Sequence, residues 1–150
     1  MKFLIQVVNH ASVNIVEKNI TNKIGQWLLI YVWISRDDVN KYTEKIDKFV
    51  NKICSTKYFH NLETHKIDQS INDINGQILL ISNFTLYWSN KKGTKLDFTD
   101  SAWYEDANRI YEDLIEKLKQ HWIRLHTWEF GAMMLVDSQN DGPINIILEY

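Results

Sequence analysis

Hydrophobic patterns follow one another along this chain in an order that few folds can accommodate. Four short alternating segments occupy the N-terminal third, at residues 3–8, 12–16, 20–24 and 27–34. Turns containing Asn, Lys or Gly separate them, so we expect antiparallel strands. A helical pattern, an apolar run, a second helical pattern and two closing strands at 126–136 and 144–149 follow. This order predicts an α+β fold in which two longer helices cover a mainly antiparallel, barrel-like sheet.

The spacing of apolar residues locates both helices. The first begins at Asp37–Asp38, whose carboxylates suit the positive end of a helix dipole, and extends to Ile53. The second covers about Trp103 to Trp122. Its core-facing stripe consists of Ala107, Ile110, Tyr111, Leu114, Leu118 and Trp122. Between the helices we expect a loop rich in Asn, His and Asp that runs to the turn signal Asn75–Gly76.

Length and composition favour one soluble unit. A chain of 150 residues, 45% of them hydrophobic, suffices for a single domain over 1–150 that buries about two-thirds of its unfolded surface. Its longest apolar stretch, Trp27 to Ile34, is far short of the roughly 20 residues that span a bilayer. Gln6 and Asn9 interrupt the N-terminal apolar run before a signal-peptide core forms. We therefore expect a cytoplasmic protein that does not enter a membrane.

Several common chemistries have no support in the sequence. His60 and His65 flank Glu63, but they lack the spacing of converging zinc ligands, so no metal is expected. Cys54 falls on an apolar helical face and is expected to act as a small hydrophobe. Glycine-rich phosphate loops, dinucleotide fingerprints and nucleophile elbows are missing, and we expect no cofactor. What remains is a site built largely from backbone groups.

The chain has one proline, Pro143, in the segment Asn140–Asp141–Gly142–Pro143 before the apolar tail. An X-Pro bond reduces the preference for the trans isomer to about 0.5–1 kcal/mol, and Gly142 tolerates dihedral angles closed to other residues. Such a turn can present carbonyl groups to a ligand. It can also be an ordinary turn that starts the last strand.

A second unusual segment is Gln77–Leu86, an apolar and β-branched run that ends in the polar residues Ser82, Asn83 and Thr85. It predicts a buried strand with a polar end. Further motifs follow in order: Lys91–Lys92–Gly93, then Phe130–Gly131–Ala132–Met133–Met134, then Asn140 to Pro143. In this order and spacing, over almost all of the chain, the sequence resembles the D-aminoacyl-tRNA deacylase family.

The resemblance implies an esterase that releases free amino acid from D-aminoacyl-tRNA, and from mischarged glycyl-tRNA, as part of translation quality control. Ser82, Asn83, Phe84 and Thr85 would then form the catalytic segment, with backbone N–H groups near Phe84 and Thr85 facing the oxyanion. Thr85 has no adjacent histidine to activate it, which favours a positioning role over a nucleophilic one. The 2′-hydroxyl of the terminal adenosine is a further candidate to assist hydrolysis.

The resemblance also implies a homodimer in which Gly142 and Pro143 of one subunit enter the site of the other. Their carbonyls would hold the substrate's α-amino group, and the turn would exclude an L side chain by steric clash. We also predict that Gln6 is a substrate-binding residue. Phe130 and Met134 would line the pocket, although both also fit the core of a strand.

Nucleic-acid binding requires a local patch, because the net charge of −2 gives no general attraction to RNA. The best patch consists of Lys91, Lys92 and Lys95. We expect it to contact aminoacylated tRNA, and we expect no binding to DNA.

Five positions depart from the family pattern. Asn83 replaces the family's Gln, Val7 replaces an Arg that is associated with orienting the Gly-Pro turn, and Lys95–Leu96 and Asn145 replace other usual residues. These changes leave a second hypothesis open: a dimeric, tRNA-binding relative whose catalysis is lost or redirected. A soluble α+β dimer with neither property is a third.

Overall fold

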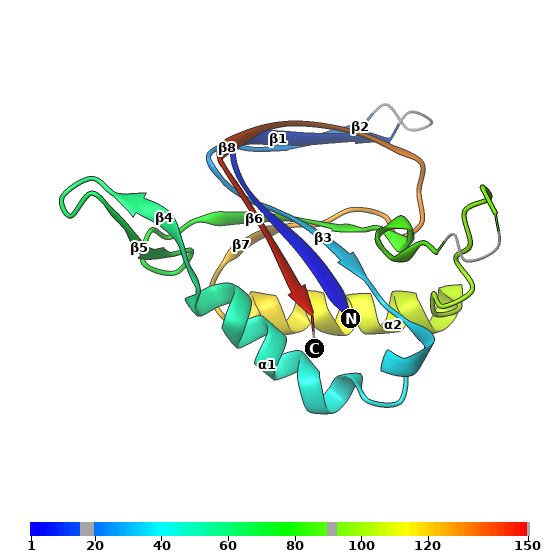
Figure 1. Ribbon diagram of the computed structural model, residues 1–150. Helices are drawn as coiled ribbons and strands as arrows, with labels where there is room; N and C mark the ends of the chain where they lie inside the picture. The colour runs from blue at the N-terminus through cyan, green and yellow to red at the C-terminus, as the bar shows by residue number, and fades with distance from the viewer. Residues whose placement is uncertain (16–19, 90–92, 150) are drawn as a thin grey trace.

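The computed structural model describes residues 1–15, 20–89 and 93–149. Its main sheet has the strand order β2-β1-β3-β6-β7, with β8 paired to the other side of β1. The bounds are β1 Lys2–Ile15, β2 Ile20–Ile24, β3 Trp27–Trp33, β6 Gln77–Ser82, β7 Arg124–His126 and β8 Met134–Glu149. Helices α1 (Tyr42–Ser55) and α2 (Tyr104–Lys119) lie beneath this curled sheet (Figure 1). The predicted α+β class and its barrel-like core with two helices are confirmed.

Two apolar clusters pack on opposite sides of the sheet. The larger joins alternate residues of β1 and β3 to the inner faces of both helices, with Phe3, Phe49 and Leu114 fully buried. The smaller uses the intervening residues, such as Val8, Leu29 and Leu79, inside the curl of the sheet. Period-two alternation explains how one strand supplies both clusters.

The predicted segments 3–8 and 12–16 are one continuous strand, β1. Val7 and Val8 are consecutive yet both buried, one in each cluster. The pairing of β1 with β8 shifts at this point, between Gln6 and Val8 and again between Val8 and His10. A β-bulge of this kind changes which face a strand buries without ending it, so the break in alternation was not a turn.

The Gly142–Pro143 segment lies within β8 and not before it. Gln6 pairs with Asn145, whereas Val8 pairs with Asn140, so β8 advances five positions while β1 advances two. The extra residues form an outward bulge in which Gly142 and Pro143 are exposed. Gly142 has a φ of +106°, and the Gly142–Pro143 peptide bond is cis. The predicted turn at this site is therefore an edge bulge on a longer strand.

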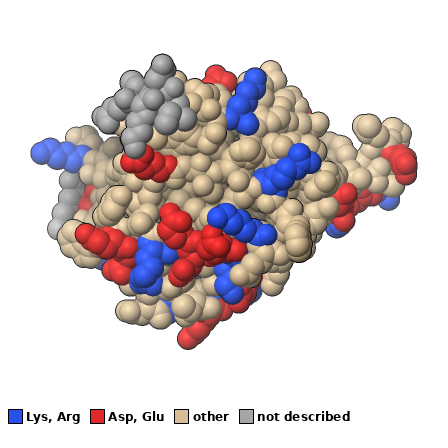
Figure 2. Space-filling view, turned by 180° about the vertical axis from the view of Figure 1, so that it is seen from behind, with Lys and Arg blue, Asp and Glu red and all other residues tan. Residues whose placement is uncertain are grey.

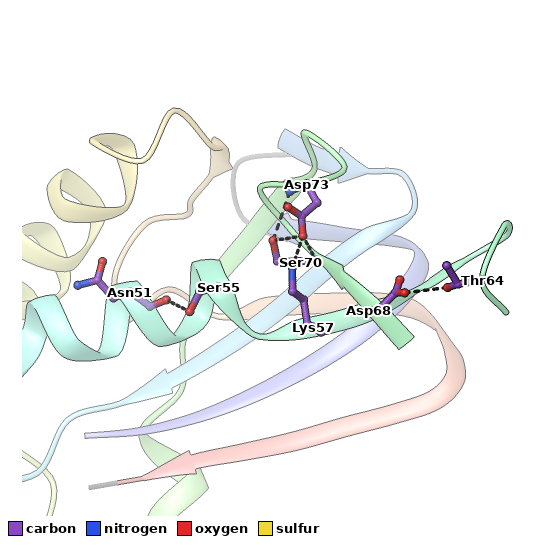
Figure 3. A network of polar contacts seen from close by, with 7 residues as sticks. All are labelled: Asn51, Ser55, Lys57, Thr64, Asp68, Ser70 and Asp73. Atoms are coloured by element: carbon purple, nitrogen blue, oxygen red, sulfur yellow. Dashed lines mark hydrogen bonds and ion pairs between the residues drawn. The ribbon is translucent and has the colours of Figure 1, made fainter. Parts of the chain in front are cut away.

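The region between α1 and β6 contains a hairpin where we predicted a loop. Strands β4 (Lys57–Asn61) and β5 (Lys66–Ser70) pair antiparallel and project from the sheet (Figure 1). Figure 3 shows its polar anchor: Lys57 Nζ lies 2.5 Å from Asp73 Oδ2, which also accepts from Ser70 N at 2.7 Å. The prediction failed because the two buried aromatic residues of β4, Tyr58 and Phe59, sit among polar neighbours.

Both helices are shorter than their patterns predicted. Asp37 and Asp38 lie in a 3₁₀ turn, η1 (Arg36–Asp38), and α1 begins only at Tyr42. Asp38 forms a capping box with Ser35 and an ion pair with the N-terminal amine of Met1, so its carboxylate does not cap α1. At the other helix, Trp122 was assigned to the buried stripe but is 92% exposed, with a φ of +59°. The chain has left α2 by that position.

The predicted strand at 126–136 is also divided. Strand β7 ends at His126, residues 127–133 form an irregular connection, and β8 starts at Met134. Gly131, with a φ of +74°, lies in this connection. Among the described residues, no helix has both the length and the apolar character needed to cross a membrane.

Candidate active site

A cavity of about 580 Å³ opens where β3 and β6 end beside the start of α2. Figure 1 shows this end of the molecule opposite the β4–β5 hairpin. Its floor includes Val32 and Ile81, and its polar residues are Tyr31, Ser82, Asn83, Thr85, Ser101 and Tyr104. The 127–133 connection and the start of β8 close one side, through residues 130–134. The predicted catalytic segment, Phe130 and Met134 therefore share one cavity.

The polar end of β6 is organised by Asn83. Its backbone N–H donates to Val32 O at 2.8 Å, which fixes the end of β6 to β3. Its side-chain oxygen accepts from Thr85 N at 3.0 Å and from Thr85 Oγ1 at 2.5 Å. Asn83 is thus the N-cap of the 3₁₀ helix η2 (Phe84–Tyr87). The shorter amide, one methylene less than the family's Gln, holds the Thr85 hydroxyl in place.

Phe130 contributes to both the cavity wall and the core. Its ring contacts those of Tyr104 and Tyr111, with centroids 5.2 and 5.5 Å apart. The Tyr104 hydroxyl donates to Phe130 O at 3.3 Å, which fastens the 127–133 connection to α2. Phe130 is partly buried and packs on the larger cluster. The two interpretations of Phe130, pocket wall and core, therefore both describe it.

The lining of the cavity is electrically neutral. Among the described residues, no Asp, Glu, His, Lys, Arg or Cys side chain lines it. Its ionisable groups are the phenols of Tyr31 and Tyr104, and burial raises the pKa of Tyr31 above its usual value. Cys54 lies elsewhere in the core, where burial raises its pKa to about 12, so it behaves as the predicted hydrophobe. This cavity is therefore suited to holding and polarising a substrate and not to strong acid or base catalysis.

Gly142 and Pro143 do not line the cavity of their own chain. Gly142 lies eight positions beyond Met134 along β8. At about 3.3 Å per strand residue, this places the bulge on the order of 25 Å along the strand from Met134. The structure therefore does not bring the predicted catalytic segment and the predicted Gly-Pro filter together within one chain.

Side-chain amides hold the bulge. Gln6 Nε2 donates to Asn145 Oδ1 at 2.8 Å, and Asn145 Nδ2 donates to Asn140 Oδ1 at 3.2 Å. Asn140 Nδ2 in turn donates to Val7 O at 2.9 Å. The side chain of Val7 points away into the core, where it is 3% exposed. Two of the departures from the family pattern, Val7 and Asn145, thus meet here, and neutral amides connect the two sides of the bulge.

The predicted tRNA patch is only partly visible. Lys91 and Lys92 lie outside the described residues, and Lys95 is exposed in a loop closed by the bridge between Ser89 and Asp97. Figure 2, which views the molecule from behind Figure 1, shows acidic side chains gathered with basic ones over the lower part of the surface that it draws. Within the described part of the chain, no three His, Cys, Asp or Glu side chains converge to hold a metal ion.

Sequence reasoning missed the residues that α2 and the preceding segment bring to the cavity. Ser101, Ala102 and Tyr104 line it, and Trp33 Nε1 donates to Ser101 Oγ at 2.8 Å. Segment 34–36 pairs with segment 100–102 through Arg36 N to Asp100 O and Ala102 N to Ile34 O. The sequence offered one signal, because the segment Phe98–Ala102 is another that resembles the deacylase family. No hydrophobic pattern, however, indicates that this segment pairs with the end of β3.

Comparison with known sequences identifies the family. A sequence profile described as D-Tyr-tRNA(Tyr) deacylase matches residues 4–149. This chain belongs to the D-Tyr-tRNA(Tyr) deacylase family. A D-aminoacyl-tRNA deacylase of Staphylococcus carnosus is 40% identical over 149 residues, covering 99% of this chain and 95% of that relative. A relative of the same name from Thermosipho melanesiensis is 36% identical over 150 residues, covering 99% of this chain and 97% of that relative. The deacylase family is one of hydrolases, and this member is an enzyme of that class.

Solved structures show the same fold. The protein titled c-Myc DNA Unwinding Element Binding Protein has a TM-score of 0.88 at 32% identity, covering 100% of this deacylase-family chain and 99% of its own. A probable eukaryotic D-amino acid tRNA deacylase has a TM-score of 0.83 at 15% identity, covering 98% and 97%. The second likeness concerns the fold alone.

Proposed function

We propose that this protein hydrolyses the ester bond of D-aminoacyl-tRNA and releases free amino acid and tRNA. The observation that carries the proposal is the neutral cavity lined by Ser82, Asn83 and Thr85. An aminoacyl ester is already activated, so its hydrolysis depends on orientation, a stabilised oxyanion and a water more than on a strong base. The names of the curated relatives support the same activity.

The developing oxyanion is the charge that this site must stabilise. Phe84 is the first residue of η2, and the first N–H of a helix has no acceptor within that helix. The N–H of Thr85 donates to Asn83 Oδ1 and is therefore already engaged. We assign the Phe84 N–H as the main backbone donor to the oxyanion. The second predicted donor, Thr85 N–H, would act only after leaving Asn83.

Thr85 is proposed to position the ester or its attacking water. Its hydroxyl hydrogen is directed to the amide oxygen of Asn83, which is too weak a base to activate a nucleophile. The oxygen of the hydroxyl keeps its lone pairs and can accept a hydrogen bond from water or from the substrate's ribose. Activation by the 2′-hydroxyl of the terminal adenosine fits a lining that supplies no base.

The chiral filter is proposed to come from a second copy of the chain. Exposed apolar side chains lie just before and within the start of β8 beside the cavity, with Met133 77% and Leu135 65% exposed. Burial of this edge in a two-fold dimer would pair equivalent surfaces and remove apolar area from water. Within one chain, Gly142 and Pro143 lie away from the cavity. The same symmetry would bring Gly142 and Pro143 of the partner toward it. Their carbonyls would then hold the substrate's α-amino group and exclude L side chains.

The matching experiment compares hydrolysis of D-tyrosyl-, L-tyrosyl- and glycyl-tRNA at catalytic amounts of protein. We expect rapid loss of the D and glycyl esters and survival of the L ester. Equal loss of D and L esters would show that the Gly142–Pro143 bulge does not select chirality. Tight binding of charged tRNA without faster hydrolysis would instead identify the tRNA-binding relative, and would contradict the proposed activity.

A further inference from the structure

Beside the residues that line the cavity is an exposed tryptophan, Trp103, that the proposed chemistry does not use. Trp103 is the N-cap of α2 and lies in sequence between two cavity-lining residues, Ala102 and Tyr104. Its side chain is 69% exposed.

Arg36 holds this indole from one side. The guanidinium carbon of Arg36 lies 5.0 Å from the centre of the Trp103 ring. Arg36 Nε also donates to Ser101 O at 3.3 Å, and its backbone N–H donates to Asp100 O at 3.0 Å. Backbone pairing of 34–36 with 100–102 therefore sets the positions of both Arg36 and Trp103. We call this pair the stacking platform, and it is formed before any ligand binds.

The surroundings favour stacking over phosphate binding. Arg36 also lines a second cavity of about 480 Å³, next to the first. That cavity mixes Lys41 and Lys45 with the carboxylates of Asp37, Asp38, Asp100 and Glu149. This mixed lining does not attract a polyanion strongly. An aromatic face supported by a guanidinium binds nucleobases through stacking, which is tolerant of sequence.

We propose that Trp103, supported by Arg36, stacks on the nucleobase that precedes the terminal adenosine in the single-stranded 3′ end of tRNA. This inference rests on the proposed function, because it needs the aminoacylated adenosine to occupy the neighbouring cavity. The strand must then leave across the rim, where Trp103 lies between Ala102 and Tyr104. The stack would give the enzyme a grip on the substrate that is separate from the amino acid.

A serine variant tests this role with little risk to the fold. Trp103 makes no side-chain capping bond, and serine is a favourable N-cap, so Trp103→Ser removes the indole without weakening the start of α2. Trp103→Phe keeps a smaller stacking face. Trp122→Ser is the matched control, because Trp122 is 92% exposed beyond the other end of the same helix.

The substrates are D-tyrosyl esters of adenosine alone, of the trinucleotide CCA and of tRNA. With Trp103→Ser, we expect kcat/KM to fall by about 5- to 150-fold for the CCA and tRNA esters, the measured range for losing one stacked base. The adenosine ester should react as with the wild type. Trp103→Phe should restore part of the loss, and Trp122→Ser should show none. The salt dependence of tRNA binding should keep its slope, since no phosphate contact is removed.

Two results would overturn the platform: wild-type kinetics of Trp103→Ser on tRNA, or an equal loss with all three esters, which would mean that Trp103 only shapes the cavity. Failure of the proposed function looks different, because wild-type protein would then hydrolyse none of the esters. In that case, weaker binding of uncharged tRNA by Trp103→Ser than by Trp122→Ser would still support the platform, and equal binding would refute it.

Discussion

The two ends of the sheet hold their polar groups by opposite means. At the hairpin end, the carboxylate of Asp73 is surrounded by donors from Lys57 and Ser70 within the same chain. At the cavity end, the neutral side chains of Asn83 and Thr85 bond to each other and face an open cavity. Charges that are fully paired stabilise a fold, whereas oriented but uncommitted groups are able to meet a substrate. The difference separates residues that hold the structure from residues that can act.

Helix α2 shows the same difference along its length. Its first turn contributes Tyr104 and Ala107 to the cavity. Its middle is structural: the Tyr111 hydroxyl donates to Leu80 O at 2.9 Å, and burial raises the pKa of this phenol. Its last turn carries the exposed pair Lys119 and Glu116. The helix therefore ties the cavity to the core through Tyr111 and Leu80 on β6.

The largest effect on catalysis is expected from Gly142, which lies at neither the hairpin end nor the cavity end. Gly142→Ala should lower kcat/KM for D-aminoacyl-tRNA by at least about 100-fold, because a misplacement of about 1 Å at a catalytic centre has effects of this size. A Cβ at this position would lie 2.9 Å from Ile144 N, at a φ of +106°. The bulge must then shift, and with it the carbonyls proposed to hold the α-amino group. Kinetics with D- and L-tyrosyl-tRNA, together with thermal unfolding, measure both consequences.

The control for this variant is Gly25→Ala. A Cβ at Gly25 meets nothing closer than Trp27 Nε1 at 3.9 Å, and Gly25 does not have a left-handed φ. It should retain wild-type kinetics. If Gly142→Ala also keeps its rate and its preference for the D ester, the bulge does not take part in the site, and the cavity of one chain is sufficient.

A smaller loss is expected at the cavity end itself. Thr85→Val keeps the shape of the side chain and removes its hydroxyl, so kcat should fall by about 10-fold, the equivalent of one hydrogen bond. Thr85→Ser should stay near the wild type. A nucleophile would behave differently, since its removal lowers kcat by about four orders of magnitude or more. Single-turnover kinetics with D-tyrosyl-tRNA distinguish the two sizes of effect, and the larger one would refute a positioning role.

Local patterns were sufficient to locate the polar part of the cavity wall on β6. The polar end of an otherwise apolar run identified Ser82, Asn83 and Thr85, because a buried strand can expose polar groups only where it leaves the core. The stripe from Ala107 to Leu118 likewise identified the buried face of α2. In both cases the information lies within a few residues of the site that it describes.

Features that depend on pairing between distant segments could not be predicted in this way. The β1 bulge places Val7 and Ala11, which would share a face in a regular strand, in different clusters. Its register is set by β8, more than a hundred residues away. The contact of Ser101 with Trp33 depends on a bridge between segments 34–36 and 100–102. Trp122 fitted the helical stripe, yet α2 ends at Lys119, before it reaches this residue. Tertiary contacts decided the first two of these outcomes.

The smallest effect on catalysis is expected at the hairpin end, where Asp73→Asn should leave kcat/KM unchanged and lower Tm by a few degrees, on the order of 2–4 °C. The hydrogen bond from Lys57, followed by those from Ser70, holds the pKa of Asp73 well below its usual range. A carboxyl group with a lowered folded pKa stabilises the protein above its unfolded pKa of about 3.9, and that contribution is lost as the pH falls toward the folded value.

The difference in Tm between wild type and Asp73→Asn should therefore be constant from pH 8 to about pH 5 and should shrink below about pH 4. Thr85→Val is the natural counterpart, since it should alter kcat with no pH-dependent change in Tm. A drop in activity for Asp73→Asn at a temperature where it remains folded would break the division between the two ends. It would mean that the hairpin communicates with the cavity through β6, which begins only four residues after Asp73.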